Sequence, residues 1–148
     1  MTLCQTRCRE WLSLRSVLLM AAFLCISACA GDNTDSQSHL NIIGTYVDEF
    51  GTTQTITQTT WSDSFGDVFH ILSYSNFQEY LIAQNDAANA FNPSLYSRFD
   101  WTRFNGDLYY CQSAFDAPDF NTALAASADP SNPSASGCGG FLWTNLTP

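Results

Sequence analysis

Lysine is absent from this chain of 148 residues, and its only cations apart from histidine are five arginines. Three of these, Arg7, Arg9 and Arg15, precede residue 16, so residues 29 onward carry 13 acidic residues against two arginines, a formal charge of −11. A domain this acidic repels phosphate backbones and anionic lipid head groups. We therefore expect no nucleic-acid binding, and solubility is sufficient to explain the acidity.

The chain also lacks a run of about 20 apolar residues, which is the length that a transmembrane helix needs. The uncharged segment 16–28 is shorter. It follows the three arginines and ends in small residues, which is the pattern of an export signal.

The end of this segment, Ile26-Ser27-Ala28-Cys29, resembles the lipobox of bacterial lipoproteins. In that family the cysteine thiol receives a diacylglyceryl group, the signal is cut just before the cysteine, and the new amino group is usually acylated. The resemblance implies a signal peptide over residues 1–28, lipidation at Cys29 and a membrane partner reached through this covalent lipid, with no other cofactor. Several acyl chains are needed because a single chain anchors only marginally.

Two further inferences concern the same boundary. Ala30 follows the cysteine at the position where an aspartate retains many enterobacterial lipoproteins in the inner membrane, so the resemblance favours the outer membrane. Alternatively, Ala28-Cys29-Ala30 fits the A-x-A box of an ordinary secretory signal, and cleavage after Ala30 would release a soluble protein.

Two cysteines, Cys111 and Cys138, remain after the leader and the lipobox are set aside. An even pair in an exported domain predicts a disulfide. The spacing does not suit a zinc site, because no histidine or third cysteine lies nearby.

The mature chain predicts a flexible tether over residues 29–40, which are mostly small and polar, and a single domain over 41–148. Turns such as Asn105-Gly106 separate short β-prone segments, and Asp119 is a suitable N-cap for a short helix over residues 119–126. The strands are expected at 46–50, 52–61, 68–74, 77–83, 96–104, 108–112 and 141–144. In the second of these, alternation would place Thr53, Thr55, Thr57 and Thr59 on the same face as Trp61.

Six or seven short strands favour a mainly β fold, a small antiparallel meander that closes as a barrel or a sandwich, with one short helix near the C-terminus. Gly44-Thr45-Tyr46 resembles the opening strand of lipocalin-like barrels. The body is similar to uncharacterised bacterial lipoproteins that share this stretch, Arg98-Phe99-Asp100-Trp101 and Cys138-Gly139-Gly140-Phe141, and this similarity implies no activity.

His70 is the only histidine of the predicted domain, and no Gly-x-Ser-x-Gly elbow accompanies it. Its neighbours Phe69 and Ile71 favour a structural, partly buried histidine, so we assign no catalytic residue. His39 falls in the tether and is expected to be solvated. Arg98 and Asp100 share one face of a strand and can form a salt bridge.

Carboxylates are plentiful, and an envelope hydrolase that uses two of them across a cleft is the alternative function. The candidates are Asp48, Glu49, Asp63, Asp67, Asp86, Asp100 and Asp107. Calcium could be held by Asp63 with Asp67, or by Asp86 with Asn89 and Asn92, although neither stretch fits an EF-hand loop. We assign no metal site.

Aromatic residues make up 14% of the chain. Trp61, Trp101 and Trp143 could line a site for a glycan or an apolar ligand, or could fill the core, which we expect for Trp101 because Phe99 shares its face. The sequence thus favours a lipid-anchored, non-enzymatic binding or structural module of the cell envelope.

Overall fold

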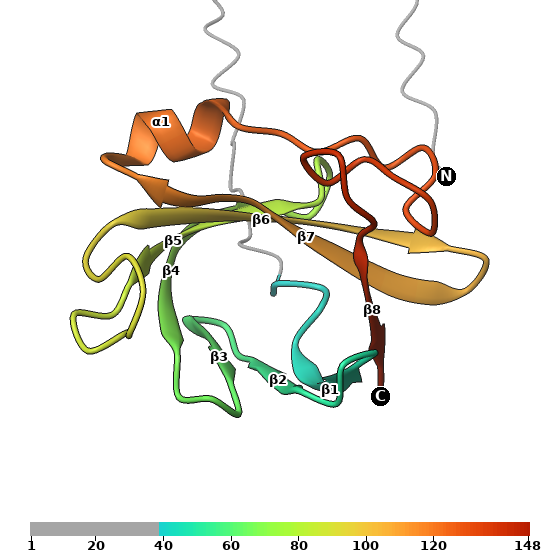
Figure 1. Cartoon of the computed structure of the whole chain (residues 1–148), viewed down its shortest axis with the longest axis horizontal. Coiled ribbons are helices and arrows are strands. Elements are labelled where there is room, and N and C mark those ends of the chain that lie inside the picture. Colours follow the sequence, from blue (N-terminus) through green and yellow to red (C-terminus); the bar gives the residue numbers. More distant parts are fainter. Residues whose placement is uncertain (1–38) are drawn as a thin grey trace, which may run out of the picture. The chain divides into compact units, whose positions relative to one another are not determined.

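The computed structural model describes residues 39–148, which form a closed, antiparallel β-barrel (Figure 1). Each strand pairs with the next along the chain, and β8 closes the barrel against β1. The elements are β1 (Gly44–Asp48), β2 (Thr53–Ile56), β3 (Thr60–Asp63), β4 (Val68–Ser75), β5 (Tyr80–Asn85), β6 (Tyr96–Phe104), β7 (Asp107–Ala117), α1 (Phe120–Ala125) and β8 (Thr144–Thr147). Within residues 39–148, no helix is long and apolar enough to cross a bilayer.

This architecture confirms the predicted meander with one short helix near the C-terminus, and of the two predicted closures it is the barrel that forms. The Asn105-Gly106 turn joins β6 to β7, and both of its residues have positive φ, at 54° and 97°. The helix has the predicted N-cap, since the Asp119 side chain accepts a hydrogen bond from the backbone N–H of Thr122.

The threonine-rich segment 52–61 is where the strand prediction was wrong, because the chain turns there and forms β2 and β3. The Thr57 hydroxyl accepts hydrogen bonds from the backbone N–H groups of Thr59 and Thr60, at 3.2 and 2.9 Å. A threonine that bonds nearby backbone groups competes with the strand ladder. The predicted face is corrected too. Trp61 points inward with Gln54 and Ile56, and not with the alternating Thr53, Thr55, Thr57 and Thr59.

Other boundaries differ as well: β1 covers Gly44–Asp48 in place of the expected 46–50, and β7 extends to Ala117 beyond the expected end at 112. Phe77 lies in the β4–β5 turn, and β5 begins at Tyr80. The last strand, β8, begins at Thr144 and not at Phe141, which instead forms an isolated bridge with Cys138. Leu40, placed in the tether, is only 2% exposed and belongs to the core.

The barrel interior is filled by apolar side chains from most of the strands. Trp61 stacks on Phe99 with ring centroids 4.5 Å apart, and Phe69 meets Phe99 edge-on at 5.0 Å. Leu40 and Ile42, which precede β1, join this core, and Figure 1 shows their segment inside the ring of strands. The core therefore includes the chain that enters the barrel as well as the strands.

A second, smaller cluster lies outside the barrel, where α1 covers β5, β6 and β7. Ile82, Ala117 and Ala123 are its buried members. The central part of β6 is consequently buried on both faces, whereas β4 has its outer face open to solvent.

Candidate functional site

A surface pocket of about 360 Å³ lies where the β1–β2 turn, the start of β7 and the segment that leads into β8 meet. We call it the Trp143 pocket. Its lining residues are Glu49, Asp107, Tyr109, Ser134, Leu142, Trp143 and Asn145. The lining combines carboxylate, amide and hydroxyl groups with one indole and one aliphatic side chain, and it contains no lysine, arginine or histidine.

The wall that carries Ser134, Leu142 and Trp143 is an irregular segment, and it is fixed covalently to the barrel. Cys138 forms a disulfide with Cys111 of β7, with Cα atoms 5.6 Å apart, as predicted. Backbone hydrogen bonds join Cys138 and Phe141 in both directions, at 3.0 and 2.8 Å. The pocket wall is thus cross-linked where it has no sheet to support it.

Trp143 is held by its backbone and by its ring nitrogen. Its backbone N–H donates to the carbonyl of Pro133 at 3.0 Å, and its Nε1 donates to the carbonyl of Asp129 at 3.1 Å. Gly137 permits this packing, because a Cβ there would lie 2.0 Å from the Asp129 carbonyl oxygen and 2.8 Å from the indole nitrogen. Its φ of +105° also favours glycine.

A polar chain runs through the barrel interior from Asp48, the residue before Glu49. The Asp48 carboxylate accepts a hydrogen bond from the Gln54 amide at 3.2 Å, and the Gln54 carbonyl accepts one from Trp61 Nε1 at 2.8 Å. Tyr110 packs on Trp61, and burial, with a further contribution from Asp48, raises the pKa of Tyr110 to about 12. These buried groups are hydrogen-bonded, as buried polar groups usually are, and they belong to the barrel interior and not to the pocket lining.

The three tryptophans named from the sequence do not come together. Trp61 and Trp101 are 1% and 2% exposed and lie in the barrel core, as expected for Trp101. Trp143 is also 2% exposed but lines the pocket. Of the three tryptophans that could have lined a ligand site, Trp61 and Trp101 belong to the core, and Trp143 borders the pocket. Cys29 lies outside the described residues.

The apolar neighbours of His70 predicted a partly buried side chain, and this prediction was wrong. His70 lies on the solvent-exposed outer face of β4. Its side chain is 49% exposed, and Nε2 lies 2.7 Å from the Asp86 carboxylate. Alternation along the strand explains the error, because His70 points away from the face of Phe69 and Ile71. A hydrogen bond from the Ala88 backbone N–H, helped by His70, lowers the pKa of Asp86.

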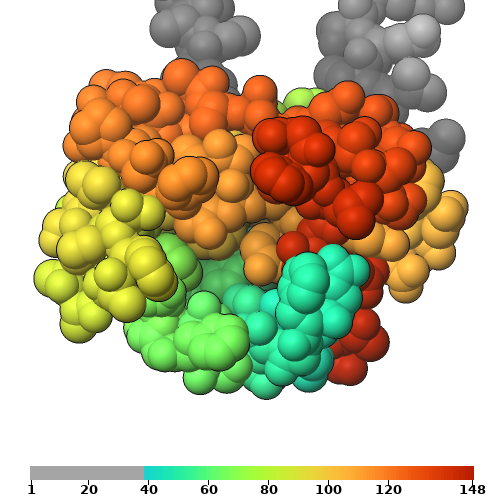
Figure 2. All heavy atoms as spheres, in the orientation of Figure 1, coloured from blue at the N-terminus to red at the C-terminus, as the bar shows by residue number. Residues whose placement is uncertain are grey.

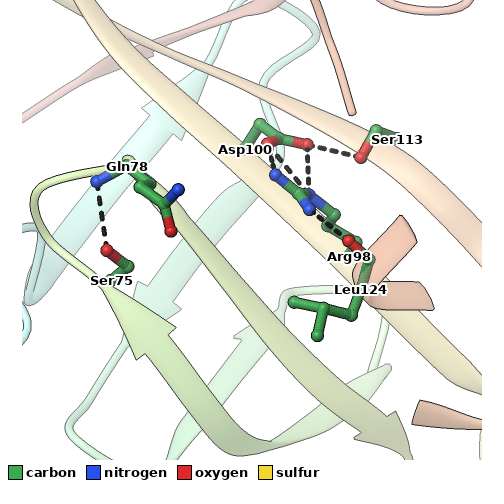
Figure 3. A network of polar contacts seen from close by, with 6 residues as sticks. All are labelled: Ser75, Gln78, Arg98, Asp100, Ser113 and Leu124. Carbon is green, nitrogen blue, oxygen red and sulfur yellow. Dashed lines mark hydrogen bonds and ion pairs between the residues drawn. The ribbon is translucent and has the colours of Figure 1, made fainter. Parts of the chain in front are cut away.

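Arg98 and Asp100 form the predicted salt bridge, with nitrogen and oxygen 2.7 Å apart (Figure 3). Ser113 also donates to the Asp100 carboxylate, and Arg98 donates to the carbonyl of Leu124 in α1 at 2.7 Å. The guanidinium lies 4.3 Å from the ring centre of Tyr80. The network therefore links α1 to the barrel. Figure 3 also shows the β4–β5 turn, which lies apart from this network and in which the backbone N–H of Gln78 donates to Ser75 Oγ at 3.1 Å.

The calcium candidates are engaged in turns. Asp63 Oδ1 accepts hydrogen bonds from the backbone N–H groups of Phe65 and Asp67, and Asn89 bonds both backbone groups of Val68. Among residues 39–148, no group of three His, Cys, Asp or Glu side chains is placed to hold a metal ion.

Comparison with protein-family models, with curated proteins and with solved structures found no match to this chain.

Proposed function

We propose that the protein is a lipid-anchored, non-enzymatic module of the cell envelope that binds a small hydroxyl-rich ligand, such as a sugar unit, in the Trp143 pocket. The observation that carries the proposal is the lining of this pocket, in which hydrogen-bonding groups of both kinds surround an indole and a leucine. Ligand sites commonly pair apolar contact area with a few well-placed polar groups.

The lining selects among ligand classes. The oxygens of Glu49, Asp107 and Asn145 can accept hydrogen bonds from hydroxyl groups, and Tyr109 and Ser134 can donate. Leu142, 53% exposed, offers apolar surface to the C–H face of a ring, whereas Trp143, 2% exposed, adds little contact area of its own. With two carboxylates and no cation in the lining, the pocket disfavours anions, and its polarity favours a glycan over an apolar ligand.

Binding to this pocket is tested by titrating the ¹⁵N-labelled protein with glucose, N-acetylglucosamine and their β-linked oligomers while recording NMR shifts. We expect shifts at Tyr109 and Asn145, and weaker binding by roughly two- to tenfold in Tyr109→Phe and in Asn145→Ala, since a hydrogen bond is worth about 0.5–1.5 kcal/mol. Thr45→Ala, exposed on β1, is the matched control. Shifts that avoid the pocket for every probe would contradict the proposal.

Glu49 and Asp107 line the same pocket, which is the observation that favours the alternative, an envelope hydrolase with paired carboxylates. The same oligomers decide between the two functions. If the wild type releases new reducing ends from these oligomers and neither Glu49→Gln nor Asp107→Asn does so, the protein is a hydrolase and not a binding module.

The anchor is supported by Ile26-Ser27-Ala28-Cys29. We expect a mature protein that begins at Cys29 and carries acyl chains, held at the outer membrane. Intact-mass analysis tests this: Cys29→Ser should abolish lipid labelling and leave the precursor unprocessed. Unacylated mature protein that begins at Gly31 would indicate simple secretion instead.

A further inference from the structure

Five connections between strands carry a phenylalanine that contacts little of the domain, and those of the β4–β5 and β7–β8 connections are Phe77, 95% exposed, and Phe141, 78% exposed. Phe50, Phe65 and Phe91 are 79%, 85% and 76% exposed. They lie in the β1–β2, β3–β4 and β5–β6 connections. Because successive strands of a meander alternate in direction, these odd-numbered connections all lie at one end of the barrel. We call it the Phe end, and Figure 2 shows these teal, green and yellow segments bordering one hollowed face.

Two of these turns have the same sequence pattern and the same hydrogen bonds. They are Asp48-Glu49-Phe50-Gly51 and Asp63-Ser64-Phe65-Gly66. In each, the aspartate Oδ1 accepts from the phenylalanine N–H, at 3.0 and 2.9 Å, and from the N–H four residues on, at 2.8 and 3.1 Å. The glycine has positive φ in both, at 82° and 101°. The turn thus depends on aspartate and glycine.

The phenylalanine side chain has no such role in the turn. Asp86 begins the third connection in a similar way, since its Oδ1 accepts from the Ala88 N–H at 2.8 Å, and Phe91 follows within a loop pinned by Asn85, whose amide donates to the Asn92 carbonyl at 2.8 Å. Single exposed apolar residues are ordinary, but three large ones in connections at the same end of a barrel indicate an interaction surface.

The side chains that carry a permanent charge around these residues are acidic, and His70, whose Nε2 lies 2.7 Å from the Asp86 carboxylate, is the neighbour that can take up a proton. Glu49, Asp63, Asp67 and Asp86 lie within or beside the three connections. Of the two arginines of the described domain, Arg98 is buried under α1 and Arg103 lies beside the Asn105-Gly106 turn at the opposite end. The Phe end is therefore apolar with an acidic surround, which complements an apolar face bordered by lysine or arginine and repels anionic lipid.

The chain enters the domain at the other end. The backbone N–H of Leu40 donates to Gln58 in the β2–β3 connection at 3.1 Å, and the Asn76 amide in the β4–β5 connection donates to the His39 carbonyl at 2.9 Å.

We infer that the Phe end is a docking surface for a protein partner that presents an apolar patch surrounded by basic residues. This surface is distinct from the Trp143 pocket in its chemistry, although Glu49 borders both. A substitution at the Phe end can therefore abolish partner binding while ligand binding in the Trp143 pocket is retained, and the two losses can be measured separately.

The test measures binding of the purified full chain to a synthetic amphipathic peptide composed of leucine and lysine. A peptide with glutamate in place of lysine controls for charge. We expect the combined variant Phe50→Ser, Phe65→Ser and Phe91→Ser to bind the leucine–lysine peptide at least about tenfold more weakly, with unchanged melting temperature. Phe77→Ser, which removes a side chain that is 95% exposed at the opposite end, should bind as the wild type does.

Because the three substitutions leave net charge unchanged, equal binding by the variant and the wild type would show plain electrostatic attraction and overturn the proposal. A second variant, Asp67→Asn, should weaken binding more at low salt than at high salt, and the absence of that difference also counts against it. Binding of neutral phosphatidylcholine vesicles that depends on the three phenylalanines would assign the surface to a membrane. Self-association that the triple variant abolishes would assign it to a second copy of this chain, and either result replaces the inference.

Discussion

Strands β4 and β6 each present on the outer face of the barrel one basic side chain beside a carboxylate, His70 with Asp86 and Arg98 with Asp100, and the nitrogen–oxygen distance is 2.7 Å in both. Their surroundings differ. The side chains of Arg98 and Asp100 on β6 are 10% and 8% exposed beneath α1, whereas those of His70 and its partner Asp86 are 49% and 35% exposed. Equal geometry therefore does not mean equal free energy, because water screens one pair and the other has been removed from water.

The largest effect is expected inside the barrel beneath β6, where Trp101 is buried. Trp101→Ala should lower the free energy of unfolding by about 3–5 kcal/mol, since it removes a large apolar side chain and leaves a cavity. Urea denaturation followed by circular dichroism measures this. Phe115→Ala, on β7 and 55% exposed, is the control and should change it much less. Wild-type stability in Trp101→Ala would mean that the inner face of β6 contributes little.

The disulfide supports β7, the neighbour of β6, and should come next. Cys111→Ser combined with Cys138→Ser is expected to lower the free energy of unfolding by about 3–4 kcal/mol in the chain-entropy model. The same loss should follow reduction of the wild-type protein, and reduction should leave the double variant unchanged. Thiol alkylation of denatured, unreduced wild-type protein should label neither cysteine. Stoichiometric labelling of both would show that the pair is not oxidised.

Removing one partner of the buried pair should have a slightly smaller effect. Asp100→Ala is expected to lower the free energy of unfolding by about 3 kcal/mol. This is at the lower end of the usual loss when a buried charge is left without its partner, because Arg98 keeps its contacts with the Leu124 carbonyl and the Tyr80 ring. Arg98→Met combined with Asp100→Leu should recover much of this loss. If the double variant is as unstable as Asp100→Ala, the pair itself and not the stranded charge stabilises α1.

The exposed pair on β4 should give the smallest effect. His70→Ala is expected to change the free energy of unfolding by no more than about 0.5 kcal/mol, as is usual for surface positions. The pKa of Asp86 should rise yet stay below its ordinary value, because the Ala88 N–H, the larger cause, remains. A lowered carboxyl pKa stabilises the fold above the unfolded pKa, and this contribution is lost as pH falls through the folded pKa. NMR titration of the Asp86 carboxyl tests this, and an unchanged pKa would mean that His70 contributes nothing.

The same two strands show which features local sequence could predict. The β6–β7 hairpin and the Arg98–Asp100 pair follow from alternation and from Asn105-Gly106. The burial of that pair does not, because its cover comes from Leu124, much later in the chain. His70 was misplaced by weighing its neighbours in sequence above the two-residue period of a strand. The threonine segment was ambiguous, since threonine suits both strands and turns.

The candidate sites divide in a similar way. Trp143 could be named from the sequence, but its neighbours in the pocket come from the β1–β2 turn, the start of β7 and β8, and closure of the barrel brings them together. No local pattern specifies such a meeting. The Phe end, by contrast, had a visible signal that was overlooked: the pattern Asp-x-Phe-Gly occurs at residues 48–51 and again at 63–66.

The seam between the first and last strands is short: β1 and β8 are registered over two residue pairs, Val47 with Thr147 and Asp48 with Leu146. A closed barrel has no free edge, and this seam is where one could be created most easily. Release of β8 would uncover β1 and β7 together, so that two molecules crowded side by side could exchange their last strands. Strand β8 thus covers an edge of β1 that would otherwise be open to pairing with another strand.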